Sequence, residues 1–247
     1  TSGKHEFTYN ESPTPIMDYP MLQEGRLYNF EDLTYPHYGF LTYGPIVSTS
    51  TYKTSCLLDG DFTLTEHSPF VDNEFNAFAI CCVDSVRFVG IDIYRYLIGR
   101  EGQSSSLRGW REGHGHYRNV LFSVIEKTLL SNRFSTRKKD YIAKHIVAPL
   151  FNNMLVIYDS LHLWDKIPSL IQELGEYSCL LDICKQYVED YYPATLPILK
   201  YYPLRLNKQG AKQPQLYGYT GNCAPCTTAT STPTSEICSN TPQKRGN

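Results

Sequence analysis

The chain has 247 residues, of which 41% are hydrophobic and 19% are charged, enough for one large domain or two small ones with a packed core. Its 23 Lys and Arg residues are balanced by 25 Asp and Glu residues, which gives a formal net charge of −2. This balance excludes the strong positive field of a nucleic-acid-binding protein. No apolar run approaches the roughly 18 to 20 residues that span a bilayer, and eight irregularly spaced cysteines fit a reducing compartment, so we expect a cytoplasmic chain.

The N-terminal part shows little helical periodicity. Residues 1–36 are rich in Pro, Tyr and polar side chains and predict a loop, with one short helix near residues 30–33. Residues 40–52 are dense in β-branched and aromatic side chains, which favours an extended segment. A short helix or turn is expected to follow at residues 53–58.

One amphipathic helix and two short strands are expected next. Asp72 precedes apolar residues that recur with the spacing of a helix packed on a core, namely Phe75, Phe78, Ala79, Cys82 and Val83. Asp is a preferred residue immediately before a helix, so Asp72 is predicted to be the N-cap. Residues 85–89 and 91–98 are rich in β-formers on either side of Gly90 and predict two strands, followed by a loop over residues 99–106.

From about residue 113 onward, apolar side chains recur every three or four positions. They predict two antiparallel helices, the second of which should be interrupted at Pro149 because proline lacks a backbone donor. A third helix is expected from Asp165 to Gly175 and a fourth over residues 176–191. Residues 206–247 are dominated by Gln, Gly, Pro, Ser and Thr and predict a disordered tail.

The most specific block of sequence lies between Tyr52 and Ser106. It contains HSPFVDNEF, an acidic motif in front of a helix, and IDIYRYLIGREGQSSS, an aromatic-rich stretch that ends in Arg, Gly and Ser. Both resemble the C-terminal, acceptor-side half of bacterial family 2 glycosyltransferases with the GT-A fold, over residues 40–108. The resemblance implies an α/β fold class, with a partial GT-A-like acceptor half at residues 1–108, an α-helical region at residues 109–205 and the disordered tail.

The resemblance also implies a reaction, the inverting transfer of a sugar from a nucleotide-sugar donor to a hydroxyl of a polysaccharide or lipid-linked acceptor. Such a transfer needs a base to take the proton of the attacking hydroxyl, and the acid that matches the family motif is Asp72. Amide dipoles at a helix start would lower the pKa of this carboxyl and keep it ionised. The simpler interpretation, that Asp72 is only an N-cap, is compatible with the catalytic role.

Two loops carry the predicted substrate-binding residues. Glu66 and His67 lie just before the acidic motif and are predicted to hydrogen-bond acceptor hydroxyls, although loop residues of these types are often merely solvated. Arg100, Gln103 and Ser104 occupy a Gly-flanked loop that the resemblance places near the donor diphosphate. The alternative interpretation of this second loop is a surface turn.

A metal-dependent GT-A enzyme holds Mn²⁺ or Mg²⁺ on an Asp-x-Asp motif against the donor diphosphate. We expect this divalent metal for the full-length enzyme, with its site outside this chain. The segment Asp59-Gly60-Asp61 matches the letters, but it lies downstream of the family's position and is a typical turn signal. The sequence also lacks an opening strand and a Gly-rich phosphate loop, so we expect the donor half to be missing and the chain to be inactive alone.

Two further interpretations stay open. Arg137, Lys138 and Lys139 predict a solvated helix face, or a peripheral contact with an anionic acceptor lipid or a membrane surface at the inner face of the plasma membrane. A different class of function is a helical binding or scaffold module, in which residues 113–205 bind a partner without catalysis. The sequence upstream of Thr1 would discriminate between the two functions, because only the glycosyltransferase requires an opening strand and an Asp-x-Asp motif there.

Overall fold

The computed structural model describes residues 2–9, 22–30, 47–60, 62–98, 103–104, 106–177 and 179–206. These residues form a small sheet beside a larger set of helices, which agrees with the coarse prediction of an α/β protein with a helical C-terminal region. The predicted disordered tail lies outside the described residues, except for Leu206, which ends a helix. Arg100 and the short helix predicted after Phe30 also lie outside them.

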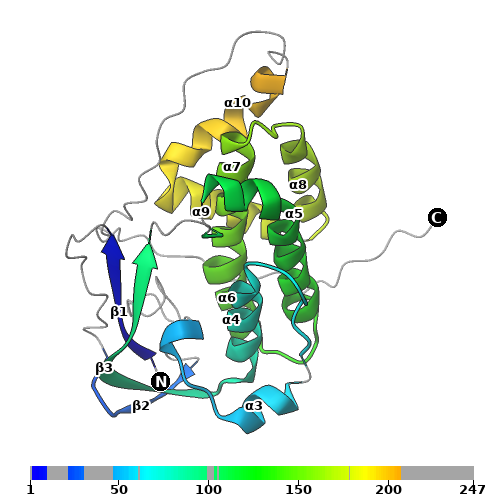
Figure 1. Cartoon of the computed structure of the whole chain (residues 1–247). Coiled ribbons are helices and arrows are strands. Elements are labelled where there is room, and N and C mark those ends of the chain that lie inside the picture. Colours follow the sequence, from blue (N-terminus) through cyan, green and yellow to red (C-terminus); the bar gives the residue numbers. More distant parts are fainter. Residues whose placement is uncertain are drawn as a thin grey trace.

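A three-stranded sheet of order β1-β3-β2 lies on one side of the helices (Figure 1). The central strand is β3 (Ser85–Ile98); β1 (Ser2–Tyr9) pairs with it in parallel and β2 (Leu27–Asn29) pairs with it antiparallel. Both outer strands lie in the region predicted to be a loop, and β3 is continuous across Gly90, where two strands were expected. Both predictions were wrong because strand formation here depends on pairing partners that are distant in the sequence.

The helices follow one another with short connections. In chain order they are η1 (Val47–Thr49), α3 (Thr54–Asp59), α4 (Val71–Cys82), α5 (Leu107–Val124), η2 (Ile125–Leu129), α6 (Thr136–Ile142), η3 (Ala143–Val147), α7 (Ala148–Ser160), α8 (Lys166–Gly175), α9 (Leu180–Tyr191), η4 (Pro193–Thr195) and α10 (Leu196–Leu206). Apolar spacing correctly predicted α4, helix start and stop signals correctly predicted α8, and α3 lies where a short helix or turn was expected. By contrast, η1 replaces part of an expected extended segment, α9 begins later than expected, and α10 was not predicted.

Ser106 determines where α5 begins. Its side-chain oxygen accepts a hydrogen bond from the backbone N–H of Gly109 at 3.1 Å, the usual arrangement of an N-cap. The helix therefore starts at Leu107, ahead of the first apolar repeat that the sequence analysis recognised. The predicted domain boundary after residue 108 falls inside α5, and one hydrophobic core extends across it from Leu22 to Ile198.

Two π-helical turns interrupt the regular helices. η2 continues α5, and η3 joins α6 to α7, with Pro149 in the first turn of α7. Proline offers no backbone N–H, so a widened turn just before it removes the need for a regular helical hydrogen bond at that position. The interruption predicted at Pro149 is confirmed, and it takes the form of a π turn within a continuous helical path.

α4 connects the sheet to the helices. It packs against α3, α5 and α6, and it carries Phe78, Ala79 and Ile80 into the core. On the side of the sheet, the ring of Phe30 meets Tyr141 of α6 edge-on, with ring centroids 5.4 Å apart. The middle of α4 is therefore part of the core that joins the two parts of the fold.

The core assignment is testable at Phe151 of α7, whose side chain has 0% exposed surface. Phe151→Ala should lower the free energy of unfolding by about 3 to 5 kcal/mol, because it leaves a cavity in a packed interior. Leu58→Ala on α3 is the control, because Leu58 is 75% exposed; its effect should stay within roughly 0.5 kcal/mol. Urea unfolding measures both variants, and equally small effects would contradict the core position of Phe151.

Candidate functional site

The predicted acidic motif lies at the start of α4. The N-cap of this helix is Phe70, which makes no side-chain capping bond, and Asp72 is the second residue of the first turn. The prediction that Asp72 is the N-cap was therefore wrong by two positions. Phe70 has a φ of 72°, a left-handed conformation that a bulky residue adopts only when its surroundings impose it. Those surroundings are the ring of Tyr117, with centroids 4.6 Å apart, and the backbone of Gly113.

Asp72 combines an exposed surface with a partly desolvated carboxyl group. Desolvation raises its pKa and outweighs the backbone hydrogen bonds from Asp72 and Asn73, which lower it. The expected lowering by helix dipoles is thus reversed. The charge of Asp72 also adds to burial in raising the pKa of Tyr117, so the carboxylate lies close enough to this buried phenol to influence it. Asp72 is therefore a more basic carboxylate than an ordinary surface Asp.

Glu66 and His67 belong to the loop of residues 62–70, which leads into α4. Both side chains are exposed, and His67 has a φ of 53°, a second left-handed position in this loop. At the C-terminal end of this loop, Pro69 and Phe70 pack on Gly113 of α5. Glu66 and His67 thus lie exposed in the loop directly before α4, and Asp72 is exposed in the first turn of that helix.

Gln103 and Ser104 lie against the first turn of α5. A Cβ on Gly109 would come within 2.7 Å of the carbonyl oxygen of Gln103 and 2.6 Å of that of Ser104, so only glycine permits this approach. Gly109 and Gly113 are one turn apart and share a face of the helix. The two predicted loops are therefore brought to neighbouring turns of α5.

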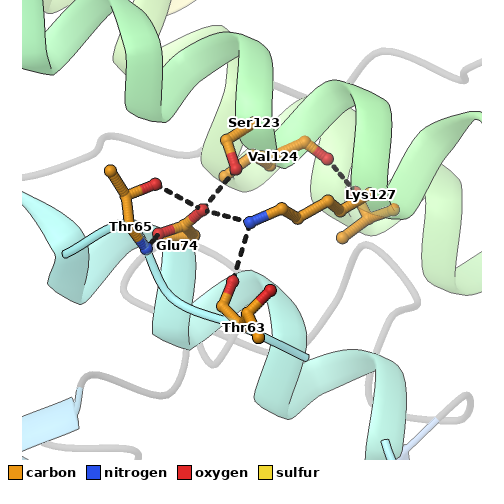
Figure 2. A network of polar contacts seen from close by, with 7 residues as sticks. Thr63, Thr65, Glu74, Ser123, Val124 and Lys127 are labelled. Carbon is orange, nitrogen blue, oxygen red and sulfur yellow. Dashed lines mark hydrogen bonds and ion pairs between the residues drawn. The ribbon is translucent and has the colours of Figure 1, made fainter. Parts of the chain in front are cut away.

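A buried polar network behind the loop was not predicted. Glu74 of α4 has 0% exposed surface, and its carboxylate accepts hydrogen bonds from the backbone N–H of Thr65 at 2.7 Å and from its hydroxyl at 3.1 Å. Ser123 of α5 donates a third hydrogen bond, and the Lys127 ammonium of η2 lies 3.1 Å away. Figure 2 shows Ser123 and Lys127 reaching toward Glu74 from the same helical segment.

The network keeps Glu74 ionised. Burial alone would raise its pKa, but the hydrogen bonds from Ser123 and Thr65 and the charge of Lys127 outweigh it, so the pKa is lowered. The sequence did contain a signal for this residue. Glu74 shares its helical face with Ala77, Phe78 and Cys81, all buried, and a carboxylate within an apolar stripe indicates a buried ion pair.

A separate hollow of about 520 Å³ lies at the other end of α4. Lys138 lines it with only 8% exposure, and its ammonium donates to a main-chain carbonyl of α4 and to Asp84, both at 3.0 Å. The prediction of a solvated basic face is therefore wrong for Lys138. Asp59 also lines this hollow, whereas Asp61 lies outside the described residues.

Comparison with family models, curated proteins and solved structures finds no match to this chain. Function is therefore inferred from the residues and their geometry. Over the described ranges, no three His, Cys, Asp or Glu side chains gather in a way that could hold a metal ion. In the same part of the chain, no helix has both the length and the apolar character needed to cross a bilayer.

The close approach at Gly109 gives a stability prediction. Gly109→Ala should lower the free energy of unfolding by about 1 to 3 kcal/mol, because backbone carbonyls cannot give way to the new methyl group as a flexible side chain would. Gly115→Ala is the control in the same helix, since nothing lies within 4 Å of its Cβ position; it should stabilise by roughly 0.5 to 1 kcal/mol. Urea unfolding of both variants tests this, and equal stabilisation would contradict the described approach.

The Glu74 network gives a pH prediction. The pKa of Glu74 in the folded chain lies below its usual value of 4.5, so its contribution to stability is present above that value and is lost as the pH falls through the lowered pKa. Glu74→Gln should therefore lower the free energy of unfolding at neutral pH by roughly 1 to 3 kcal/mol. The gap between the two proteins should shrink in acid, which urea unfolding across a pH series measures. A gap that does not change with pH would contradict the lowered pKa.

Proposed function

We propose that this chain is the acceptor-side part of an inverting glycosyltransferase and that Asp72 is its general base. The observation that carries this proposal is the environment of Asp72, an exposed carboxylate in the first turn of α4 whose pKa is raised by desolvation. A general base must be accessible to the incoming hydroxyl, and a raised pKa favours proton transfer to it, so the exposure and the raised pKa of Asp72 both support this role. The resemblance of residues 40–108 to family 2 enzymes supports the same assignment and a GT-A-like arrangement of this part.

The proposed chemistry is a single displacement. The Asp72 carboxylate takes the proton of an acceptor hydroxyl while the hydroxyl oxygen forms a bond to the anomeric carbon of the donor sugar. The bond from that carbon to the diphosphate oxygen breaks on the opposite face, and the nucleoside diphosphate leaves with the electron pair. The sugar is transferred with inversion, and no covalent enzyme intermediate is required.

The two loops on α5 are proposed to hold the substrates. Glu66 and His67 are exposed next to the start of α4, where they can hydrogen-bond the hydroxyls of a polysaccharide or lipid-linked acceptor. Gln103 and Ser104, which lie against the first turn of α5, are proposed to bind the donor. The same role is proposed for Arg100 from the resemblance alone, since this residue lies outside the described residues. The neighbouring positions of these loops support one site with an acceptor side and a donor side.

The described residues do not provide a site for the divalent metal that GT-A enzymes use with their donors. The resemblance implies that Mn²⁺ or Mg²⁺ binds in the donor half of such an enzyme, and no step proposed for this chain depends on it. We place the enzyme in the cytoplasm, at the inner face of the plasma membrane, where its donor and a lipid-linked acceptor would meet. The free thiols of Cys56, Cys81 and Cys184 are consistent with a reducing compartment.

Asp72→Asn in the natural full-length protein tests the base assignment. The amide cannot accept the proton, so turnover should fall by about 100-fold to 10,000-fold, while nucleotide and acceptor binding stay unchanged. Sugar transfer from a panel of UDP-sugars with Mn²⁺ measures the rate, and calorimetry measures nucleotide binding.

The matched control is Asp165→Asn, because Asp165 is also an exposed Asp at a helix start and makes no side-chain capping bond. It should leave turnover unchanged. Full activity of the Asp72→Asn variant would refute the role of Asp72. Absence of any donor binding by the full-length protein would refute the enzyme itself and favour the helical binding module.

A further inference from the structure

The loop that carries Glu66 and His67 is held at both of its ends. At one end, Pro69 and Phe70 pack on α5. At the other end, the backbone N–H of Thr65 donates to Glu74 at 2.7 Å. The exposed residues between these anchors therefore occupy a short span whose two ends are fixed on rigid helices.

Lys127 strengthens the second anchor. Its ammonium lies 3.1 Å from the Glu74 carboxylate and also donates to the carbonyl oxygen of Thr63 at 2.7 Å. The two members of one ion pair thus hold the same loop, Glu74 through the N–H of Thr65 and Lys127 through the carbonyl of Thr63 (Figure 2). Lys127 also lies over the ring of Phe78, 5.2 Å from its centroid, which keeps the ammonium in place.

Because Glu74 is buried, its carboxylate depends on nearby hydrogen-bond donors. A carboxylate without exposed surface is strongly destabilising unless donors surround it, and Glu74 has four of them from Thr65, Ser123 and Lys127. Two of the four come from Thr65, so a displaced loop would leave a buried charge only partly satisfied. The network therefore favours one position of the loop over all others.

The helical segment on the far side of the pair is itself irregular. Lys127 lies in the π turn η2, which ends with the N–H of Leu130 donating to the carbonyl of Ile125. The hydroxyl of Thr128 bonds back to the carbonyl of Val124 at 2.6 Å, which satisfies a main-chain acceptor in the widened turn. π turns of this kind occur frequently at functional sites.

We propose that the Glu74–Lys127 ion pair fixes the position of the loop of residues 63–70. By fixing this loop, the pair also positions Glu66 and His67, the proposed acceptor-binding residues that precede Asp72. The placement of the loop follows from the contacts of Glu74 and Lys127, and the consequence for acceptor recognition rests on the proposed function. Neither Glu74 nor Lys127 is proposed to touch substrate. Both act through the loop backbone.

Hydrogen exchange at individual amides tests the placement of the loop in the natural full-length protein. Glu74→Gln and Lys127→Met should speed exchange of the Thr65 amide by about tenfold to a hundredfold, because each weakens a charge-assisted bond to the loop. Exchange in α7 should speed up no more than the loss of global stability, measured by urea unfolding, accounts for. Lys127→Arg, which keeps the charge and several donors, should restore most of the protection. Unchanged exchange at Thr65 in the first two variants would overturn the proposal.

The matched control is Glu173→Gln. Glu173 of α8 also pairs with a cation, Arg118 of α5, but it has no contact with the loop among the described interactions. The same loss of one negative charge should leave exchange at Thr65 as in the wild type. Faster loop exchange in this variant would overturn the proposal, since it would show a general loosening rather than a local one.

Transfer kinetics test the consequence for the acceptor. Glu74→Gln and Lys127→Met should raise the KM for acceptor by about tenfold or more, while the KM for donor stays unchanged and Lys127→Arg recovers the acceptor KM. A loosened loop with unchanged acceptor kinetics would overturn the positioning role. A loosened loop in a protein that transfers no sugar at all would leave the anchoring of the loop supported and would reject the proposed function instead.

Discussion

A carboxylate without contact to water must be surrounded by donors, and this constraint on Glu74 organises the region around α4. The donors come from the loop before α4 and from one helical segment, α5 with the π turn η2 that continues it, so both meet α4 at one side chain. The pair with Lys127 is retained although buried ion pairs often contribute little net stability. The pair instead favours one position of the loop before α4, because only there does Thr65 donate its hydrogen bonds to Glu74.

Close backbone approach is the second constraint. The glycines of α5 let one loop lie on its first turn and another on the next, and the left-handed φ of Phe70 is tolerated because Tyr117 and Gly113 hold the ring. Strained residues of this kind persist where packing over-determines them. Both loops are thereby held on α5, and one of them leads into the helix whose first turn carries the exposed Asp72.

Asp72, Glu66 and His67 were singled out because the motif that contains them resembles a known family, and all three are exposed near the start of α4. Their roles in a site stay predictions. The direction of the pKa shift of Asp72 was predicted wrongly. The helix dipole can be inferred from nearby residues in the sequence, whereas the desolvation of the carboxyl group depends on the folded structure around it. Glu74 was missed although its place in an apolar stripe marked it, since its partners Ser123 and Lys127 lie far away in the sequence.

The sequence by itself determined α4 and α8, because each buries apolar residues whose spacing can be recognised along the chain. It also determined the interruption near Pro149, which follows from a missing donor. Only the tertiary structure decided the strands β1 and β2, which form by pairing with β3, and the ionisation of Glu74, which depends on donors from other segments. The physical reason is the same in both cases: pairing and electrostatics depend on distance in space, whereas periodicity depends only on distance along the chain.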